Sequence, residues 1–221
     1  MPSARASAST VIEGLYFVTA DVPELARTHE ELAQYAAAGG ASVVQLRHKA
    51  DDGRRAEAAA AVRDVCAHHG ALFVLNDDAV LAVALDADGL HLGQSDLSGL
   101  DEWRAHGRGL LGISVSSVEE ARAAVSLGAD YLGVGPIFAT GSKDDAAAPI
   151  GLDGLARIRD AVDVPLAAIG GIAEHNAAAV LAAGADAICV ISAISHAPDP
   201  HAAACRLAEI AASAHPNGGA L

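Results

Sequence analysis

Short apolar runs alternate with longer amphipathic segments along most of the chain. Within each run, apolar and polar residues do not alternate, which is typical of strands covered on both faces of a parallel sheet. We predict strands at Gly14–Thr19, Ser42–Leu46, Ala71–Leu75, Gly89–Leu92, Leu110–Ile113, Tyr131–Val134, Leu166–Ile169 and Ala187–Ile191.

The segments between these runs have helical spacing and helix-forming composition. Helices are predicted at Pro23–Ala38, Arg54–His68, Val118–Leu127, Leu152–Ala161 and Ala177–Ala182. Glycines follow the predicted helix ends, where a positive φ is favoured; they are Gly39, Gly40, Gly70, Gly128 and Gly184. Ser117 and Asn176 are the candidate N-caps.

Strands that alternate with helices over 221 residues predict a single-domain (β/α)8 TIM barrel. The alternative is a doubly wound open sheet, which normally has a Gly-rich turn after its first strand. The sequence Val18-Thr19-Ala20-Asp21 is not such a turn. We place the barrel at residues 11–212, between flexible tails at 1–10 and 213–221.

A similar turn precedes three of the predicted strands, which is typical of repeated βα units. Each turn ends in an aspartate, and these are Asp88, Asp130 and Asp186. Because they lie at the N-terminal ends of strands, away from the catalytic face of a barrel, we predict structural roles for them.

Composition narrows the classes of partner. The net charge of −14 argues against a nucleic acid or an anionic membrane as the main partner. No segment is long and apolar enough to span a bilayer, and residues 1–10 lack the apolar middle of a signal peptide. Cys66, Cys189 and Cys205 have no metal-ligand spacing and are predicted to be buried hydrophobes, as expected for a cytoplasmic protein.

The C-terminal ends of the predicted strands collect the polar residues that could form an active site. They are Gln45, Arg47, His48 and Lys49; Asn76, Asp77 and Asp78; His91, Gln94 and Asp96; Ser114; Thr140, Ser142 and Lys143; Gly170 and Gly171; and Ile191 and Ser192. This set contains two different candidate anion sites.

One candidate site combines cations with carboxylates. Arg47 and Lys49 suit phosphate oxygens, and Asp77 and Asp96 suit a hard cation such as Mg²⁺. Together they predict a magnesium-bound polyphosphate. The alternative is a set of ordinary solvated strand ends.

The other candidate site is rich in glycine. Gly170 and Gly171 precede a helix, and Ser192 follows the last strand, which matches the usual monophosphate site of a barrel. A tight structural turn is the alternative explanation for the glycines. The long segment 136–149 is predicted to be a mobile lid carrying Lys143, or else a surface insertion. Two phosphorylated ligands in one barrel suggest a transfer reaction in which pyrophosphate leaves.

Several motifs, in order between about Gly14 and Arg206, closely resemble the thiamine phosphate synthases, also called thiamine-phosphate pyrophosphorylases. These motifs are Gln45-Leu46-Arg47-His48-Lys49, Asn76-Asp77-Asp78, Gly89-Leu90-His91-Leu92-Gly93-Gln94-Ser95-Asp96-Leu97, Gly133-Val134-Gly135-Pro136-Ile137-Phe138 and Ala168-Ile169-Gly170-Gly171-Ile172.

The resemblance implies a transferase of thiamine biosynthesis. It would couple hydroxymethylpyrimidine diphosphate to hydroxyethylthiazole phosphate and release pyrophosphate by dissociative substitution, without a protein nucleophile. The implied partners are these small molecules, with no nucleic acid or membrane, and a homo-oligomer is left open. His91 and Cys189 are expected to pack or to support other groups.

The resemblance also implies a role for each site residue. Those implied for the pyrimidine diphosphate are Gln45, Arg47, Lys49, Asn76, Ser114 and Lys143, of which Arg47, Lys49, Ser114 and Lys143 would act on the leaving group. Those implied for the thiazole phosphate are Thr140, Ser142, Gly171, Ile191 and Ser192. Asp77 and Asp96 would hold Mg²⁺.

The chain departs from the family pattern at His48, where a glutamate is usual. If His48 points into the site, its titration would shift the pH optimum downward. Three other functions stay open: a thiazole tautomerase, a non-catalytic barrel that binds a phosphorylated ligand, and a sugar-phosphate epimerase. An epimerase would not bind pyrophosphate, and a regulatory barrel would bind ligands without turnover.

Overall fold

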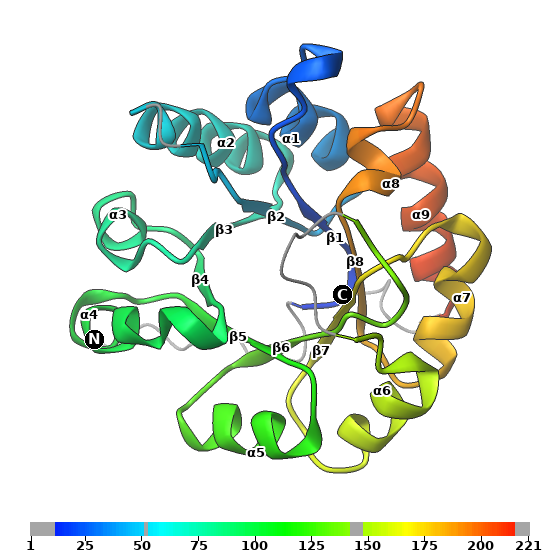
Figure 1. Ribbon diagram of the computed structural model, residues 1–221. Coiled ribbons are helices and arrows are strands. Elements are labelled where there is room, and N and C mark those ends of the chain that lie inside the picture. The colour runs from blue at the N-terminus through cyan, green and yellow to red at the C-terminus, as the bar shows by residue number, and fades with distance from the viewer. Residues whose placement is uncertain (1–11, 51–52, 142–147, 215–221) are drawn as a thin grey trace.

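The computed structural model describes residues 12–50, 53–141 and 148–214. Eight parallel strands close into a barrel in the order in which they occur in the sequence. Figure 1 looks along the barrel axis, with the strands as an inner ring and the helices outside it. The strands are β1 (Gly14–Val18), β2 (Val43–Leu46), β3 (Leu72–Asn76), β4 (Gly89–Leu92), β5 (Leu110–Val115), β6 (Tyr131–Val134), β7 (Leu166–Ile169) and β8 (Ala187–Val190). The predicted (β/α)8 barrel is confirmed.

The helices outside the ring include several that the sequence pattern did not predict. They are α1 (His29–Ala38), α2 (Arg55–His69), α3 (Ala79–Ala84), α4 (Leu100–His106), α5 (Val118–Ser126), α6 (Gly151–Arg159), α7 (Glu174–Ala182), α8 (Ser192–Ser195) and α9 (Pro200–Ala214), with 3₁₀ turns η2 (Pro23–Leu25) and η3 (Gln94–Gly99). The helical ranges named from the sequence do not include α3, α4, α8 and α9. Helix α9 continues to Ala214, two residues into the predicted C-terminal tail.

Membrane-spanning helices are not found in the described part of the chain, where none of the helices combines the necessary length and apolarity.

The single helix predicted at Pro23–Ala38 is wrong, because the chain breaks into η2 and α1. Ala26 has a φ of 51°, which a right-handed helix does not allow. Thr28 then starts α1 with a capping box: its side chain accepts a hydrogen bond from the Glu31 N–H, and the Glu31 carboxylate accepts one from the Thr28 N–H at 2.9 Å. The strong cap fixes a new helix start inside the apolar pattern.

The structure confirms one of the two predicted N-caps. Ser117 caps α5 as predicted, because its side chain accepts from the Glu120 N–H. Asn176 is not an N-cap. It lies inside α7, where its Oδ1 accepts a hydrogen bond from the Ala173 N–H at 2.8 Å and its Nδ2 donates to the Gly171 carbonyl at 2.9 Å. It therefore ties the start of the helix back to the loop after β7.

A repeated three-residue turn directly precedes each even-numbered strand, at residues 40–42, 86–88, 128–130 and 184–186. The residues at its first position all have a positive φ, and they are Gly40, Asp86, Gly128 and Gly184. Gly39, by contrast, has a φ of −83°, so only the second glycine of that pair has the predicted conformation. An alanine at the second position of each turn is buried and donates its N–H back into the preceding helix; these are Ala41, Ala87, Ala129 and Ala185.

The aspartates at the third position of this turn are structural, as predicted. Each carboxylate accepts a hydrogen bond from an N–H near the start of the preceding strand. The pairs are Asp88 with Phe73 N at 2.9 Å, Asp130 with Leu111 N at 2.8 Å, and Asp186 with Leu166 N at 2.7 Å. These bonds join neighbouring strands at the N-terminal end of the barrel.

The core has two layers, one inside the barrel and one between the barrel and its helices. The inner layer contains the buried phenols Tyr16 and Tyr131 together with small residues such as Ala167 and Cys189. Cys66 is buried in the outer layer, whereas Cys205 on α9 is only partly buried, so the prediction of burial is wrong for Cys205. The two inner phenols matter because they connect the barrel interior to the candidate site.

Candidate active site

A cavity of about 440 Å³ opens at the C-terminal ends of the strands. It lies within the usual size range of small-molecule sites. The predicted site residues that line it are Arg47, Lys49, Asn76, Asp77, Asp96, Ser114, Thr140, Gly171, Ile191 and Ser192. Gln45 instead lines a smaller cavity of about 20 Å³ inside the barrel. Ser142 and Lys143 lie outside the described residues.

The side chains of the segment after β2 point in two different directions. Arg47 and Lys49 line the cavity. His48, between them, is 8% exposed and stacks on His29 of α1, with ring centroids 4.9 Å apart. It is not among the described residues of the cavity wall, so the condition for a His48 effect on the pH optimum is not met.

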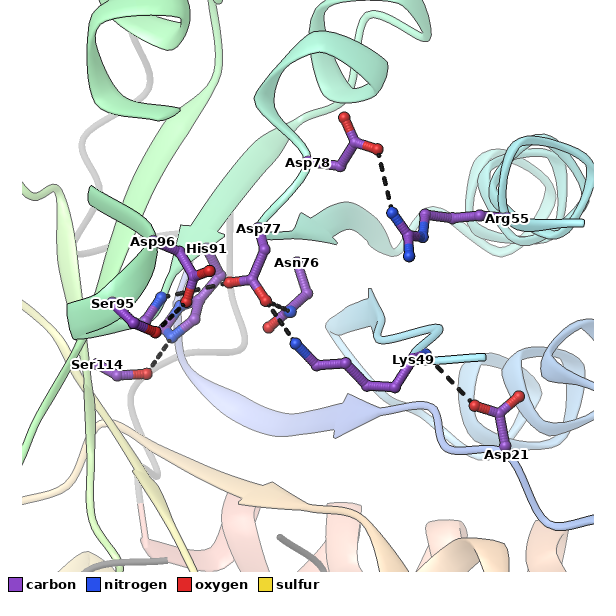
Figure 2. Close-up of polar contacts among 11 residues, drawn as sticks. Asp21, Lys49, Arg55, Asn76, Asp77, Asp78, His91, Ser95, Asp96 and Ser114 are labelled. Atoms are coloured by element: carbon purple, nitrogen blue, oxygen red, sulfur yellow. Dashed lines mark hydrogen bonds and ion pairs between the residues drawn. The ribbon is translucent and has the colours of Figure 1, made fainter. Parts of the chain in front are cut away.

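Asp77 is held in one orientation by its neighbours (Figure 2). Its Oδ2 accepts hydrogen bonds from Lys49 Nζ at 2.7 Å and from Asn76 Nδ2 at 2.5 Å. Its Oδ1 lies 3.4 Å from the N–H of Gly93 after β4. Its φ of 65° is uncommon for a residue with a side chain. Such backbone strain is often found at functional sites.

Asp96 approaches the same point from η3. Its Oδ2 accepts a hydrogen bond from Ser95 Oγ at 2.7 Å. A Cβ atom on Gly93 would lie 2.8 Å from that Oδ2, so Asp96 packs directly against this glycine. The carboxylates of Asp77 and Asp96 therefore both contact Gly93, and a side chain at that position would displace the Asp96 carboxylate.

The charge of the cavity wall is not positive overall. Among the described residues of the wall, Arg47 and Lys49 are cationic, and Asp77, Asp96 and Glu120 are acidic. An anionic ligand would face more carboxylates than cations. This donor set fits a hard cation such as Mg²⁺, bound by carboxylate oxygens and shared with phosphate oxygens.

Ser114 on β5 is the outer end of a buried hydrogen-bond network. His91 Nε2 lies 2.9 Å from Ser114 Oγ, and His91 Nδ1 lies 3.1 Å from the Tyr131 hydroxyl. The Tyr131 hydroxyl is 2.9 Å from that of Tyr16, to which Gln45 Nε2 donates at 2.8 Å. The network thus connects five strands across the barrel interior.

One direction of donation gives the hydrogens of both buried phenols an acceptor within this network. The Gln45 amide donates to Tyr16, Tyr16 to Tyr131, Tyr131 to His91 Nδ1, and the His91 Nε2–H to Ser114 Oγ. Burial raises the pKa of both Tyr16 and Tyr131, so both phenols keep their protons. Ser114 Oγ then accepts a hydrogen bond from His91, so the hydroxyl hydrogen of Ser114 points away from His91.

The opposite side of the cavity is built from backbone. Gly170 and Gly171 have φ values of 106° and 64°. A Cβ atom on Gly171 would lie 2.7 Å from the Ala139 carbonyl oxygen and 2.8 Å from Phe138 Cβ. The loop after β6 therefore packs tightly on the loop after β7, which places Thr140 in the same wall as Gly171. Ile191 and Ser192 complete this side at the start of α8.

Sequence reasoning missed three polar residues of the wall, which are Ser95, Ser116 and Glu120. Strand β5 runs to Val115, two residues beyond its predicted end. Ser116 follows Ser114 by two residues, and the period of two along a strand would have placed both on one side. Glu120 Oε2 accepts from the Ser116 N–H at 2.6 Å and from its Oγ at 3.0 Å.

Comparison with known proteins places the chain in a family. The family model described as "Thiamine monophosphate synthase" matches residues 15–194. The thiamine-phosphate synthase of Chloroflexus aurantiacus is 49% identical over 194 residues, which cover 87% of this chain and 90% of that protein. That of Moorella thermoacetica is 50% identical over 182 residues, which cover 81% of this chain and 87% of that protein.

A solved structure agrees with this placement. The thiamine phosphate pyrophosphorylase from Pyrococcus furiosus has a TM-score of 0.83 and 35% identity, with 94% of this chain and 98% of that chain covered. The residues that the family model matches, 15–194, run from β1 through β8. The chain therefore belongs to the thiamine monophosphate synthase family.

Proposed function

We propose that this chain joins hydroxymethylpyrimidine diphosphate to hydroxyethylthiazole phosphate, giving thiamine phosphate and pyrophosphate. As a member of its family it is an enzyme, a transferase that acts on small molecules. The observation that carries the proposal is one cavity with two chemically different sides. One side has charged side chains from the ends of β2 to β5, and the other has Gly170 and Gly171 after β7 and Ile191 and Ser192 after β8. A cytoplasmic location belongs to the same proposal.

The diphosphate would lie on the charged side. Arg47 and Lys49 are the cations that would bind its oxygens, and the Ser114 O–H would donate to it. Asn76 would contact the pyrimidine. Lys49 is already bonded to Asp77 at 2.7 Å, so it would be held in position before the ligand arrives. Lys143 is a further proposed cation, outside the described residues.

Magnesium is supported by the donor set rather than by any bound ion. The carboxylates of Asp77 and Asp96 both contact Gly93 and supply the oxygens that Mg²⁺ prefers. When bound there, Mg²⁺ would neutralise negative charge on the diphosphate. Asn76 and Lys49 would keep Asp77 oriented by their hydrogen bonds to its Oδ2.

The thiazole phosphate would lie on the glycine side. Gly171, Ile191 and Ser192 would surround its phosphate, with the Thr140 side chain next to it. Gln45 would act through the barrel interior, because it contacts Tyr16 rather than the main cavity. Ser142 is proposed for the same phosphate and lies outside the described residues.

The chemistry needs no covalent bond to the protein. The bond between the pyrimidine's exocyclic methylene and the diphosphate oxygen breaks, and both electrons leave with pyrophosphate. The aminopyrimidine delocalises the resulting positive charge, and the thiazole nitrogen lone pair forms the new C–N bond. Arg47 and Lys49 favour this route, because they stabilise the negative charge that grows on the leaving group.

The proposal is tested by incubating the purified chain with Mg²⁺ and both substrates and quantifying both products. We expect equal amounts of thiamine phosphate and pyrophosphate, with loss of both after EDTA treatment and in Asp77→Asn. Folded protein that forms neither product would overturn the proposal. Isomerisation of the thiazole phosphate alone would indicate a tautomerase, and binding without turnover a regulatory barrel.

A further inference from the structure

Three side chains with metal-binding atoms lie together on the far side of the segment after β2. Asp21 follows β1, His29 is the first residue of α1, and His48 lies two residues beyond β2. Their ligand atoms all lie within 4.8 Å of one another. Both histidines are buried, at 7% and 8% exposure, and Asp21 is exposed to solvent.

The donor chemistry of this cluster differs from that of the active site. Two imidazoles and one carboxylate suit first-row transition metals such as Zn²⁺, whereas Asp77 and Asp96 offer oxygen only. The cluster therefore would select a different cation. Three protein ligands would also leave a coordination position for water, since Zn²⁺ usually takes four ligands.

The orientation of His29 fits metal binding. Its Nδ1 lies 2.7 Å from Thr19 Oγ1, and its Nε2 lies 2.9 Å from Asp21 Oδ1. Because the Asp21 carboxylate can only accept, His29 Nε2 donates to it in this structure. A bound metal would displace that proton, and Nδ1 would then donate to Thr19 Oγ1. Ligating histidines commonly donate their other ring N–H in this way.

The ligand atoms, which all lie within 4.8 Å of one another, would have to adjust to bind one metal. Metal bonds of roughly 2.0–2.1 Å in a tetrahedron place neighbouring ligand atoms about 3.3 Å apart. The 2.9 Å between His29 Nε2 and Asp21 Oδ1 would therefore have to widen slightly. Asp21 is the exposed member of the cluster, so it can move without disturbing the core.

We propose that Asp21, His29 and His48 bind one transition-metal cation of the Zn²⁺ class. This site is separate from the proposed magnesium site and does not depend on the proposed reaction. The same cluster holds the backbone of the cation-bearing segment. Asp21 Oδ2 accepts a hydrogen bond from the Lys49 N–H at 3.4 Å (Figure 2), and Thr19 Oγ1 accepts one from the Arg47 N–H at 3.2 Å. The bound metal would thus fix the segment that carries Arg47 and Lys49.

The test is calorimetric titration of the chelator-treated full chain with Zn²⁺, in the presence of excess Mg²⁺ to occupy oxygen-only sites. We expect one equivalent to bind and the melting temperature to rise. Asp21→Asn and His48→Gln should each weaken binding at least about tenfold, as loss of a metal-site group commonly does. His48→Glu should largely preserve binding, because it supplies a carboxylate ligand.

Matched controls separate this cluster from other metal-binding groups. His68→Gln removes an exposed imidazole from α2, Cys205→Ser removes the thiol that lies 3.8 Å from His201 Nε2, and Asp77→Asn removes an active-site carboxylate. None of the three should change the affinity. Asp21→Asn alters an exposed residue, so its fold can be verified by an unchanged melting temperature without Zn²⁺.

Two results would overturn the proposal. One is the absence of saturable Zn²⁺ binding to the folded chain. The other is an affinity that is unchanged in both Asp21→Asn and His48→Gln, or that is lost in one of the three control variants. Co²⁺ provides a second readout, because nitrogen ligation in a low-coordinate site should give visible absorption that disappears in His48→Gln.

Discussion

Lys49 Nζ and Asp77 Oδ2 lie 2.7 Å apart across the ends of β2 and β3. The pair joins the two kinds of group that a magnesium-bound diphosphate requires, a cation and a carboxylate, before any ligand is present. Asp77 also keeps its uncommon φ of 65°. The adjacent Asp78 faces away from the cavity, toward Arg55 at 3.6 Å (Figure 2). The consecutive residues Asp77 and Asp78 thus face different surroundings, the cavity and the helix α2 side chain Arg55.

Asp77→Asn should lower turnover by about a hundredfold or more, the usual cost of losing one electrostatic group at the reacting centre. Asparagine tolerates the positive φ, so the fold should persist. The matched control is Asp78→Ala, which removes the N-cap bond to the Leu81 N–H at 3.0 Å. It should cost about 1 kcal/mol of stability and leave turnover intact. Steady-state kinetics measures turnover and urea unfolding measures stability. Equal turnover of the two variants would contradict the proposed role of Asp77 at the reacting centre.

Gly171→Ala should raise the KM for the thiazole phosphate. The new methyl would meet the Ala139 carbonyl at 2.7 Å, so the glycine side of the cavity must shift. We expect roughly a tenfold increase, equivalent to about 1.4 kcal/mol of binding. Gly151→Ala is the control: its φ of 66° is similar, but nothing lies within 4 Å of the added atom. Gly151→Ala should lower stability and leave the KM for the thiazole phosphate unchanged. An equal KM increase in both variants would show that backbone strain, rather than the contact with Ala139, is responsible.

Tyr131→Phe should destabilise the barrel by about 1–3 kcal/mol, because it leaves buried polar partners without a hydrogen bond. The partners are the Tyr16 hydroxyl at 2.9 Å and His91 Nδ1 at 3.1 Å. Turnover should also fall, since His91 orients Ser114. Tyr35→Phe removes a phenol that is 39% exposed and should change neither quantity. Guanidinium unfolding and kinetics provide the measurements. A Tyr131→Phe protein as stable as the parent would disprove the role of the network.

Stability should fall as pH rises above about 9. Burial raises the pKa of the Cys66 thiol from 9.0 to about 12. Between these values the unfolded chain loses the thiol proton and the folded chain keeps it, so each further pH unit costs up to about 1.4 kcal/mol. Above pH 10 the raised pKa values of Tyr16 and Tyr131 act in the same direction. Well below pH 9 these groups contribute no slope, because the thiol and both phenols are protonated in the folded and the unfolded chain.

Cys66→Ala isolates the thiol contribution in that pH range. The variant loses core packing at every pH, so the comparison is between slopes rather than levels. Urea unfolding from pH 8 to 10 should give a shallower decline for Cys66→Ala than for the parent chain. Identical slopes would mean that the thiol does not keep its proton in the folded state.

The sequence predicted the barrel well because its signals are local. Apolar runs without alternation specify buried parallel strands, and all eight predicted strands correspond to strands of the barrel. Placing polar residues at the ends of those strands was then enough to collect most of the polar side chains of the cavity wall, including Arg47, Asp77 and Ser192. The break before α1 was missed because the Thr28–Glu31 capping box outweighed a continuous helical pattern.

The sequence by itself therefore determined the fold, the family and most of the polar residues that face the cavity. Only the tertiary structure decided which distant groups touch. The Tyr16 and Tyr131 hydroxyls are 115 residues apart in sequence and meet only when the barrel closes. His48 lies beyond the last residue of β2, where strand periodicity no longer fixes its side, and packing against α1 turns it toward His29. Local patterns set backbone conformation and burial, but contacts across the barrel depend on how all eight strands pack together.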